Sequence, residues 1–62
     1  MLKEDLLFAL QKKVRINLTN GFHYTGVIRE LNDDSFLFTD KFGNNVVMRY
    51  DMVAIVQEVK EE

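Results

Sequence analysis

Residues 14–31, VRINLTNGFHYTGVIREL, contain the pattern that decides the fold. The first five of them alternate apolar and polar side chains, which is typical of a strand with one buried face. Asn20-Gly21 then marks a tight hairpin turn. Gly26 interrupts the second strand, and a glycine inside a strand often marks a bulge or a sharp bend. This stretch therefore predicts a bent β-hairpin.

The length of the hairpin loop decides which residues face each other. A three-residue loop, 19–21, pairs Leu18 with Phe22, Ile16 with Tyr24 and Val14 with Gly26. A two-residue loop would instead mix polar and apolar residues on one face of the hairpin. We therefore expect the three-residue loop, with Gly21 in a left-handed conformation.

The rest of the chain adds a helix and three further strands. Leucines spaced by four predict a helix over about 2–11. The hairpin's second strand runs over about 22–31, and turn residues separate further strands at 35–40, 46–50 and 53–59. A charged tail, 60–62, ends the sequence. We expect one domain, 1–62, that is mostly β: an N-terminal helix and a strongly bent five-stranded antiparallel SH3-like barrel, with its strands over about 13–59.

Composition excludes several classes of protein. The 62 residues include no cysteine and one histidine, so neither a disulfide framework nor a thiolate or histidine-rich metal site is expected. Apolar runs are too short to span a membrane, and the first residues lack the order of a signal peptide. No nucleophile–base pair or Gly-rich phosphate loop is present. We expect a soluble, cytoplasmic protein that is not an enzyme and needs no cofactor or metal.

The last two strands are apolar on both faces. Val46-Val47-Met48 and residues 52–56, MVAIV, do not alternate, and such strands need cover on both sides. One small core covers only one side. We therefore expect these strands to form an edge-to-edge subunit interface. The alternative is that the N-terminal helix covers the second face.

Two motifs together resemble the Sm-like family, which includes Lsm proteins and the bacterial RNA chaperone Hfq. The first is Val14-x-Ile16-x-Leu18-x-Asn20-Gly21-x-x-Tyr24-x-Gly26-x-Ile28-x-x-Leu31, and the second is Met48-Arg49-Tyr50-Asp51-Met52-Val53-Ala54-Ile55-Val56. The resemblance covers nearly the whole chain. It implies a closed ring, a hexamer or heptamer, in which strand four of one subunit pairs with strand five of the next. It also implies binding of single-stranded RNA, possibly U-rich, near the pore.

The resemblance also suggests where RNA would bind. In such rings one nucleotide site lies where the turn before strand three meets the turn between strands four and five. Arg49 matches the family's arginine, and a guanidinium can stack on a base and neutralise a phosphate. The candidate RNA-binding residues are Asn32, Ser35, Phe36, Arg49 and Tyr50. Tyr50 replaces the family's glycine, and the usual stacking aromatic and reading asparagine do not occur together.

Two registers of the third strand stay open. In one, Leu37 is buried and the phenylalanines at 36 and 38 face the pore or a neighbour; in the other, the phenylalanines are buried and Leu37 faces outward. Asp33 and Asp34, in the preceding turn, would repel phosphate. The alternative function is therefore a ring that scaffolds protein assembly without binding RNA.

Basic residues cluster once, at Lys12, Lys13 and Arg15. Repeated around a ring, this cluster could attract nucleic acid. The alternative is that these are solvated charges at the end of the helix.

Overall fold

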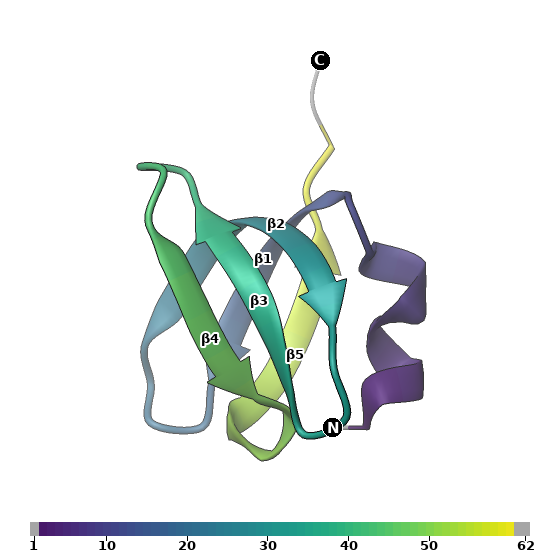
Figure 1. The fold of residues 1–62 in the computed structure, drawn as a ribbon. Coiled ribbons are helices and arrows are strands. Elements are labelled where there is room, and N and C mark those ends of the chain that lie inside the picture. Colours follow the sequence, from purple (N-terminus) through teal and green to yellow (C-terminus); the bar gives the residue numbers. More distant parts are fainter. Residues whose placement is uncertain (1, 61–62) are drawn as a thin grey trace.

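A computed structural model describes residues 2–60 as one curled sheet with a short helix beside it (Figure 1). The elements are the 3-10 helix η1 (Lys3–Ala9), the strands β1 (Lys13–Leu18), β2 (His23–Leu31), β3 (Ser35–Asp40) and β4 (Asn45–Arg49), the 3-10 turn η2 (Tyr50–Met52), and the strand β5 (Val53–Glu58). Of the predicted charged tail, residues 61–62 lie outside the described residues. The expected mostly-β fold is confirmed.

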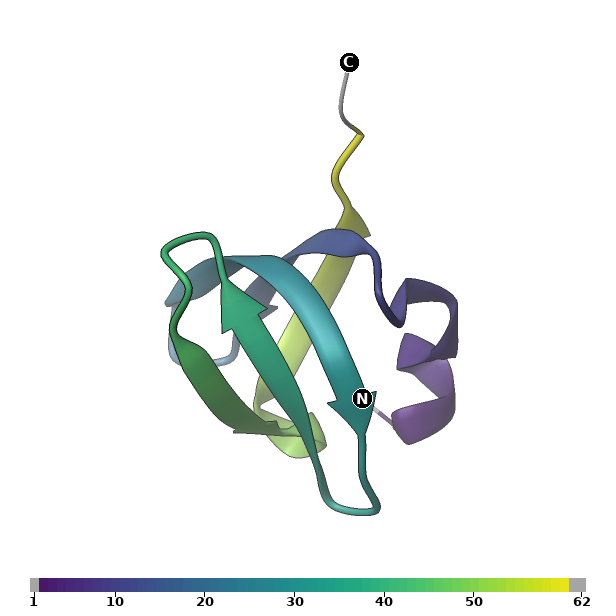
Figure 2. The ribbon, with the colours of Figure 1, turned by 45° about the horizontal axis from the view of Figure 1, so that its top comes forward.

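The five strands form one antiparallel sheet in the order β4-β3-β2-β1-β5. The sheet curls so that β1 and β5 lie behind β3 and β4 (Figures 1 and 2). β4 and β5 stand at the two ends of the strand order and do not pair with each other in the described chain. The five antiparallel strands that the sequence predicted are therefore confirmed, but the curled sheet is not closed, because β4 and β5 each keep one edge without a partner strand.

The first hairpin has the register that the three-residue loop predicts. Val14 lies opposite Gly26, and Ile16 lies opposite Tyr24. The backbone N–H of Leu18 donates to the carbonyl of Phe22 at 2.7 Å. Residue 21 has a φ of 92°, a left-handed conformation that favours glycine. The expected turn is therefore confirmed.

Gly26 is needed for a close approach between β2 and β3. It lies opposite Asp40, and a Cβ atom at this position would overlap the backbone of Thr39. The sequence predicted a bulge or bend near this glycine. The irregularity in the β2–β3 register comes slightly later, between Ile28 and Glu30. Glycine at this position therefore permits the backbones of β2 and β3 to approach closely.

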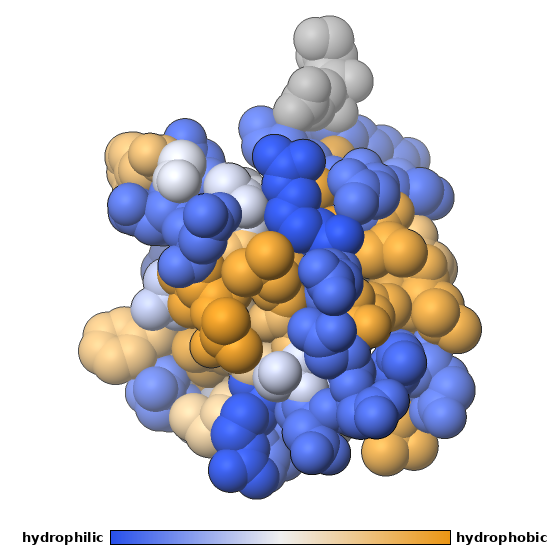
Figure 3. Space-filling model, viewed as in Figure 1, coloured by the Kyte–Doolittle hydropathy of each residue, from blue (hydrophilic) through white to orange (hydrophobic). Residues whose placement is uncertain are grey.

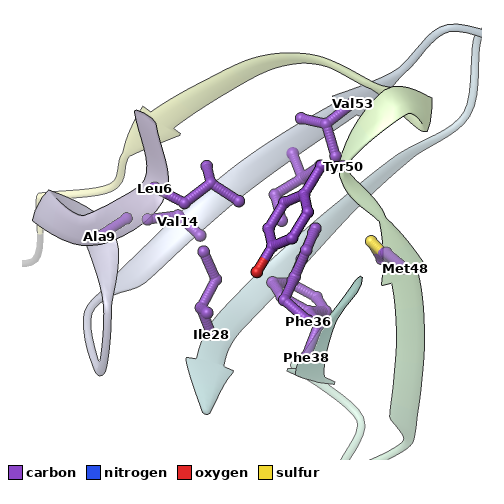
Figure 4. Packing of buried hydrophobic residues seen from close by; sticks show 10 residues of the cluster. Leu6, Ala9, Val14, Ile28, Phe36, Phe38, Met48, Tyr50 and Val53 are labelled. Carbon is purple, nitrogen blue, oxygen red and sulfur yellow. The ribbon is translucent and has the colours of Figure 1, made fainter. Parts of the chain in front are cut away.

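The core fills the inside of the curl (Figure 4). Its buried members are Leu6, Ala9, Val14, Ile16, Ile28, Phe36, Phe38, Met48, Tyr50 and Val53. Phe36 and Phe38 have no exposed surface, whereas Leu37 is half-buried and faces the other side. The strand therefore has the second of the two registers left open by the sequence.

The N-terminal helix differs from the expected one in type and in its buried face. It is a 3-10 helix of 7 residues, whose side chains three positions apart lie above each other. Leu6 and Ala9 have this spacing and both are fully buried. Leu2 and Leu10, which the spacing of four assigned to the buried stripe, are 67% and 37% exposed. The predicted period of 3.6 was therefore wrong for this segment.

The helix ends where the chain turns back to meet β2. Gln11 has a φ of 64°, and its backbone N–H donates to the carbonyl of Ile28 at 2.8 Å. This places η1 beside the end of β2 (Figure 2). The helix does not cover the outer faces of β4 and β5. On these faces Val47 is 69% exposed and Ile55 is 49% exposed. The alternative that the helix covers these strands is therefore excluded.

Candidate nucleic-acid and assembly site

Strand pairing brings the predicted RNA-binding residues to one end of the sheet. Ser35, at the start of β3, lies opposite Arg49, at the end of β4. The Tyr50 hydroxyl donates to the backbone carbonyl of Asn32 at 2.6 Å. The β2–β3 turn and the η2 turn are thus joined directly. The ring of Phe36 stacks on that of Tyr50, with centroids 5.4 Å apart, so all five candidates lie close together.

Two of these five residues are core side chains. Phe36 is fully buried and Tyr50 is 7% exposed (Figure 4). Burial raises the pKa of the Tyr50 hydroxyl, and the carboxylates of Asp33 and Asp34 act in the same direction. Neither ring presents a face on the surface of this protomer. In this protomer the two rings therefore pack inward and offer no face on which a base could stack.

Arg49 is the exposed cation of this site. Its guanidinium forms an ion pair with Asp51, with Nη2 and Oδ2 3.0 Å apart, and both side chains are more than half exposed. Ion pairs at such exposure contribute little to stability, so the guanidinium can exchange its partner at small cost. A phosphate or a base could therefore compete for Arg49.

The surroundings of Arg49 are acidic. Asp33 and Asp34 are exposed in the adjoining turn, and Asp33 is paired loosely with Lys3 at 3.9 Å. Together with Asp51, the carboxylates outnumber the cations at this end of the sheet. Asn32 and Ser35 can exchange hydrogen bonds with a base. Because of the excess of carboxylates, the site attracts phosphate only weakly.

The two edge strands carry exposed apolar side chains. Val47 on β4, Ile55 on β5 and Met52 between them are 69%, 49% and 38% exposed. Figure 3 shows apolar side chains gathered over β3 and β4 in the middle of the view. A mainly apolar groove of about 330 Å³ is lined by Leu18, Tyr24, Val46, Val47, Met48, Arg49 and Met52. Free backbone edges beside apolar surface are the usual features of a strand that pairs with another chain.

The predicted basic cluster is divided in the structure. Lys12 pairs with Glu58, with Nζ and Oε1 3.7 Å apart, and both residues line a shallow depression with Lys13. Arg15 instead lines a different groove, with His23 and the β3–β4 loop. Residues of that loop were not among the sequence candidates, because nothing in the local pattern links them to Arg15.

No family model matches this sequence, and neither a curated protein nor a solved structure gives a significant match. Within residues 2–60, no group of three or more acidic or histidine side chains is placed to hold a metal ion. No helix in the same range is long and apolar enough to cross a membrane.

Proposed function

We propose that this protein is a non-catalytic Sm-like protein that forms a closed homo-oligomeric ring and binds single-stranded RNA near the pore. The observation that carries the proposal is the position of Arg49. It stands at the end of β4, a strand with one free edge, lies opposite Ser35 and is exposed. A residue at an assembly edge is repeated once for each subunit around a ring.

The free edges of β4 and β5 support the proposed ring. Each strand already pairs on one side, with β3 and β1 respectively, and each has its other edge available. β4 of one copy and β5 of the next can therefore continue the sheet from subunit to subunit. Such pairing would also cover Val47 and Ile55, which the protomer leaves exposed.

RNA binding would depend on repetition. A single site with one arginine and several neighbouring carboxylates binds a nucleotide weakly. When one RNA strand meets the same site on several subunits, the later contacts are intramolecular, and the overall affinity exceeds that of any one site.

A ring that scaffolds protein assembly is the second candidate function. It is favoured by the acidic surroundings of Arg49 and by the burial of Phe36 and Tyr50. Under this alternative, Arg49 and Asp51 form an ordinary surface ion pair.

The two functions separate in one experiment. The mass of the protein in solution is measured by light scattering, and fluorescence anisotropy follows binding of U-rich, A-rich and mixed single-stranded RNA at low and moderate salt. We expect a ring-sized species that binds RNA. Arg49→Ala should lower both its RNA affinity and the salt dependence of that affinity. Arg29→Ala, an exposed arginine elsewhere on the sheet, is the matched control. A ring that binds none of the three RNAs supports the scaffold.

A separate variant tests the assembly edge. Val47→Glu places a charge on the exposed edge of β4 and should reduce the ring to smaller species. Leu7→Glu makes the same kind of change on η1, where the side chain is 58% exposed, and should leave the mass unchanged. A protein that is monomeric before any substitution contradicts the ring.

A further inference from the structure

A groove of about 370 Å³ lies between the outer face of the first hairpin and the β3–β4 loop. Its lining includes Arg15 from β1, His23 and Thr25 from β2, and Lys41 and Phe42 from the loop. No residue of β4 or β5 lines it, so assembly through those strands does not require the groove to be covered.

The loop that forms one wall is held by its own backbone. The Asp40 carboxylate accepts hydrogen bonds from the backbone N–H groups of Phe42 and Asn44, both at 2.9 Å. The backbone N–H group of Asn44, followed by the other donors of the loop, lowers the pKa of Asp40. The backbone N–H of Lys41 donates to the carbonyl of Thr25 at 2.8 Å. These bonds fix the loop over β2 without using the side chains of Lys41 or Phe42.

The groove combines cations with an exposed aromatic ring. The Lys41 ammonium lies 5.3 Å from the centroid of the Phe42 ring, and Phe42 is 77% exposed. Arg15 and His23 are exposed on the neighbouring strands and form no ion pair within the described residues. The Asp40 carboxylate, the one acid of the lining, is already satisfied by N–H donors of the loop. Neither Arg15 nor Lys41 forms an ion pair within the described residues, so both are available to an anion.

The charge balance favours this groove over the Arg49 end of the sheet as a place for phosphate. Two cations face one carboxylate here, whereas several carboxylates surround Arg49. The two places are also distinct, because Ser35 and Asp40 are the opposite ends of β3. At about 3.3 Å per residue, these ends are roughly 16 Å apart.

We propose that the groove binds a nucleotide. Its phosphate would lie between the side chains of Arg15 and Lys41, with His23 as a further polar contact. Its base would stack on Phe42, since base–aromatic stacking together with a cation beside the backbone is the usual way in which proteins hold an unpaired nucleotide. The inference does not depend on the proposed RNA site at Arg49, because the two sites share no residue.

The nucleotide has two possible sources, a free mononucleotide or one unit of a single-stranded RNA, and both supply the same phosphate and base. Backbone and side-chain NMR resonances of the intact protein are followed during titration with adenosine monophosphate, uridine monophosphate, inorganic phosphate and a short oligouridylate. We expect Arg15, His23 and Phe42 to shift with the nucleotides. Shifts with the mononucleotides identify a free ligand, and shifts with the oligonucleotide alone identify a strand.

Variants separate this site from the proposed RNA site. Phe42→Ala should weaken nucleotide binding at least about fivefold, the usual loss for one stacked base, and Arg15→Ala should also weaken it. Phe22→Ala, which removes the 66% exposed ring from the other hairpin loop, should have no effect. Arg49→Ala should leave these shifts intact even where it abolishes ring–RNA binding. The proposal is overturned by an absence of shifts at Arg15 and Phe42 with every ligand, or by equal losses in Phe22→Ala and Phe42→Ala.

Discussion

Replacing Tyr50 with phenylalanine separates a structural role for this residue from a role in RNA binding. The change removes the hydroxyl that donates to the Asn32 carbonyl at 2.6 Å and keeps the ring that stacks on Phe36 at 5.4 Å. A hydrogen bond of this kind contributes about 0.5–1.5 kcal/mol net. Asn32 is exposed, so water can bond to its carbonyl in the variant and limit the loss. We expect the free energy of unfolding to fall by about 1 kcal/mol, or about 4–8 °C in Tm.

Denaturant unfolding followed by circular dichroism measures this loss. Protein concentration is held fixed, because any assembly makes apparent stability depend on it. The expected result is a lower midpoint with an unchanged slope and with RNA affinity equal to the wild type. Tyr50→Ala is the reference for losing the whole ring and should cost about 3–5 kcal/mol. Wild-type stability in Tyr50→Phe refutes the contribution assigned to this hydrogen bond, and a selective loss of RNA affinity refutes the core assignment.

Three further predictions concern the core and pH. Leu6→Ala should lower the free energy of unfolding by about 2–5 kcal/mol, measured by heat or denaturant, because the Leu6 side chain is fully buried. Leu7→Ala, at an exposed position, should change it by less than about 0.5 kcal/mol, and equal effects of the two variants contradict the packing of η1. Gly26→Ala should lower the free energy of unfolding by about 1–3 kcal/mol, because the new Cβ must displace the backbone of Thr39. A neutral result in the same assay argues against the close approach of β2 and β3. Burial raises the pKa of Tyr50, so the stability that its neutral hydroxyl contributes should be complete below the ordinary value of 10.0 and lost as pH rises above it. Unfolding measured across alkaline pH should show this decline in the wild type and not in Tyr50→Phe.

The hairpin and the strand positions were predictable because their signals are local. Period-two alternation and Asn20-Gly21 act over a few residues, and together they specify both the pairing of Ile16 with Tyr24 and the left-handed Gly21. The two registers of β3 could not be separated in the same way. Leu37 and its phenylalanine neighbours are all apolar, so only the position of the core decides which of them points inward.

The helix was predicted less well, because its end and its buried face depend on contacts distant in sequence. The bond from Gln11 to Ile28 ends the helix early, and the 3-10 period buries Ala9 in place of Leu10. Hydrophobic spacing alone contains neither fact.

The candidate site was predictable in part. The positions of Asn32, Ser35 and Arg49 at one end of the sheet follow from which turns precede and follow the strands. The burial of Tyr50 does not follow from its neighbours, which are charged. The groove between Arg15 and Phe42 is formed by residues far apart in the chain, so no local pattern could indicate it.

The pairing of β1 with β5 has a consequence for synthesis of the chain. β1 ends at Leu18, and β5 begins at Val53, roughly 35 residues later, so a ribosome needs about 2–7 s to supply the partner strand. During that time one edge of β1 has no partner. β5 closes this edge on one side and, under the proposed ring, provides the contact to the next subunit on the other. Under that proposal, the strand that completes the protomer also carries one of its two assembly contacts, so a chain that still lacks β5 could not close a ring.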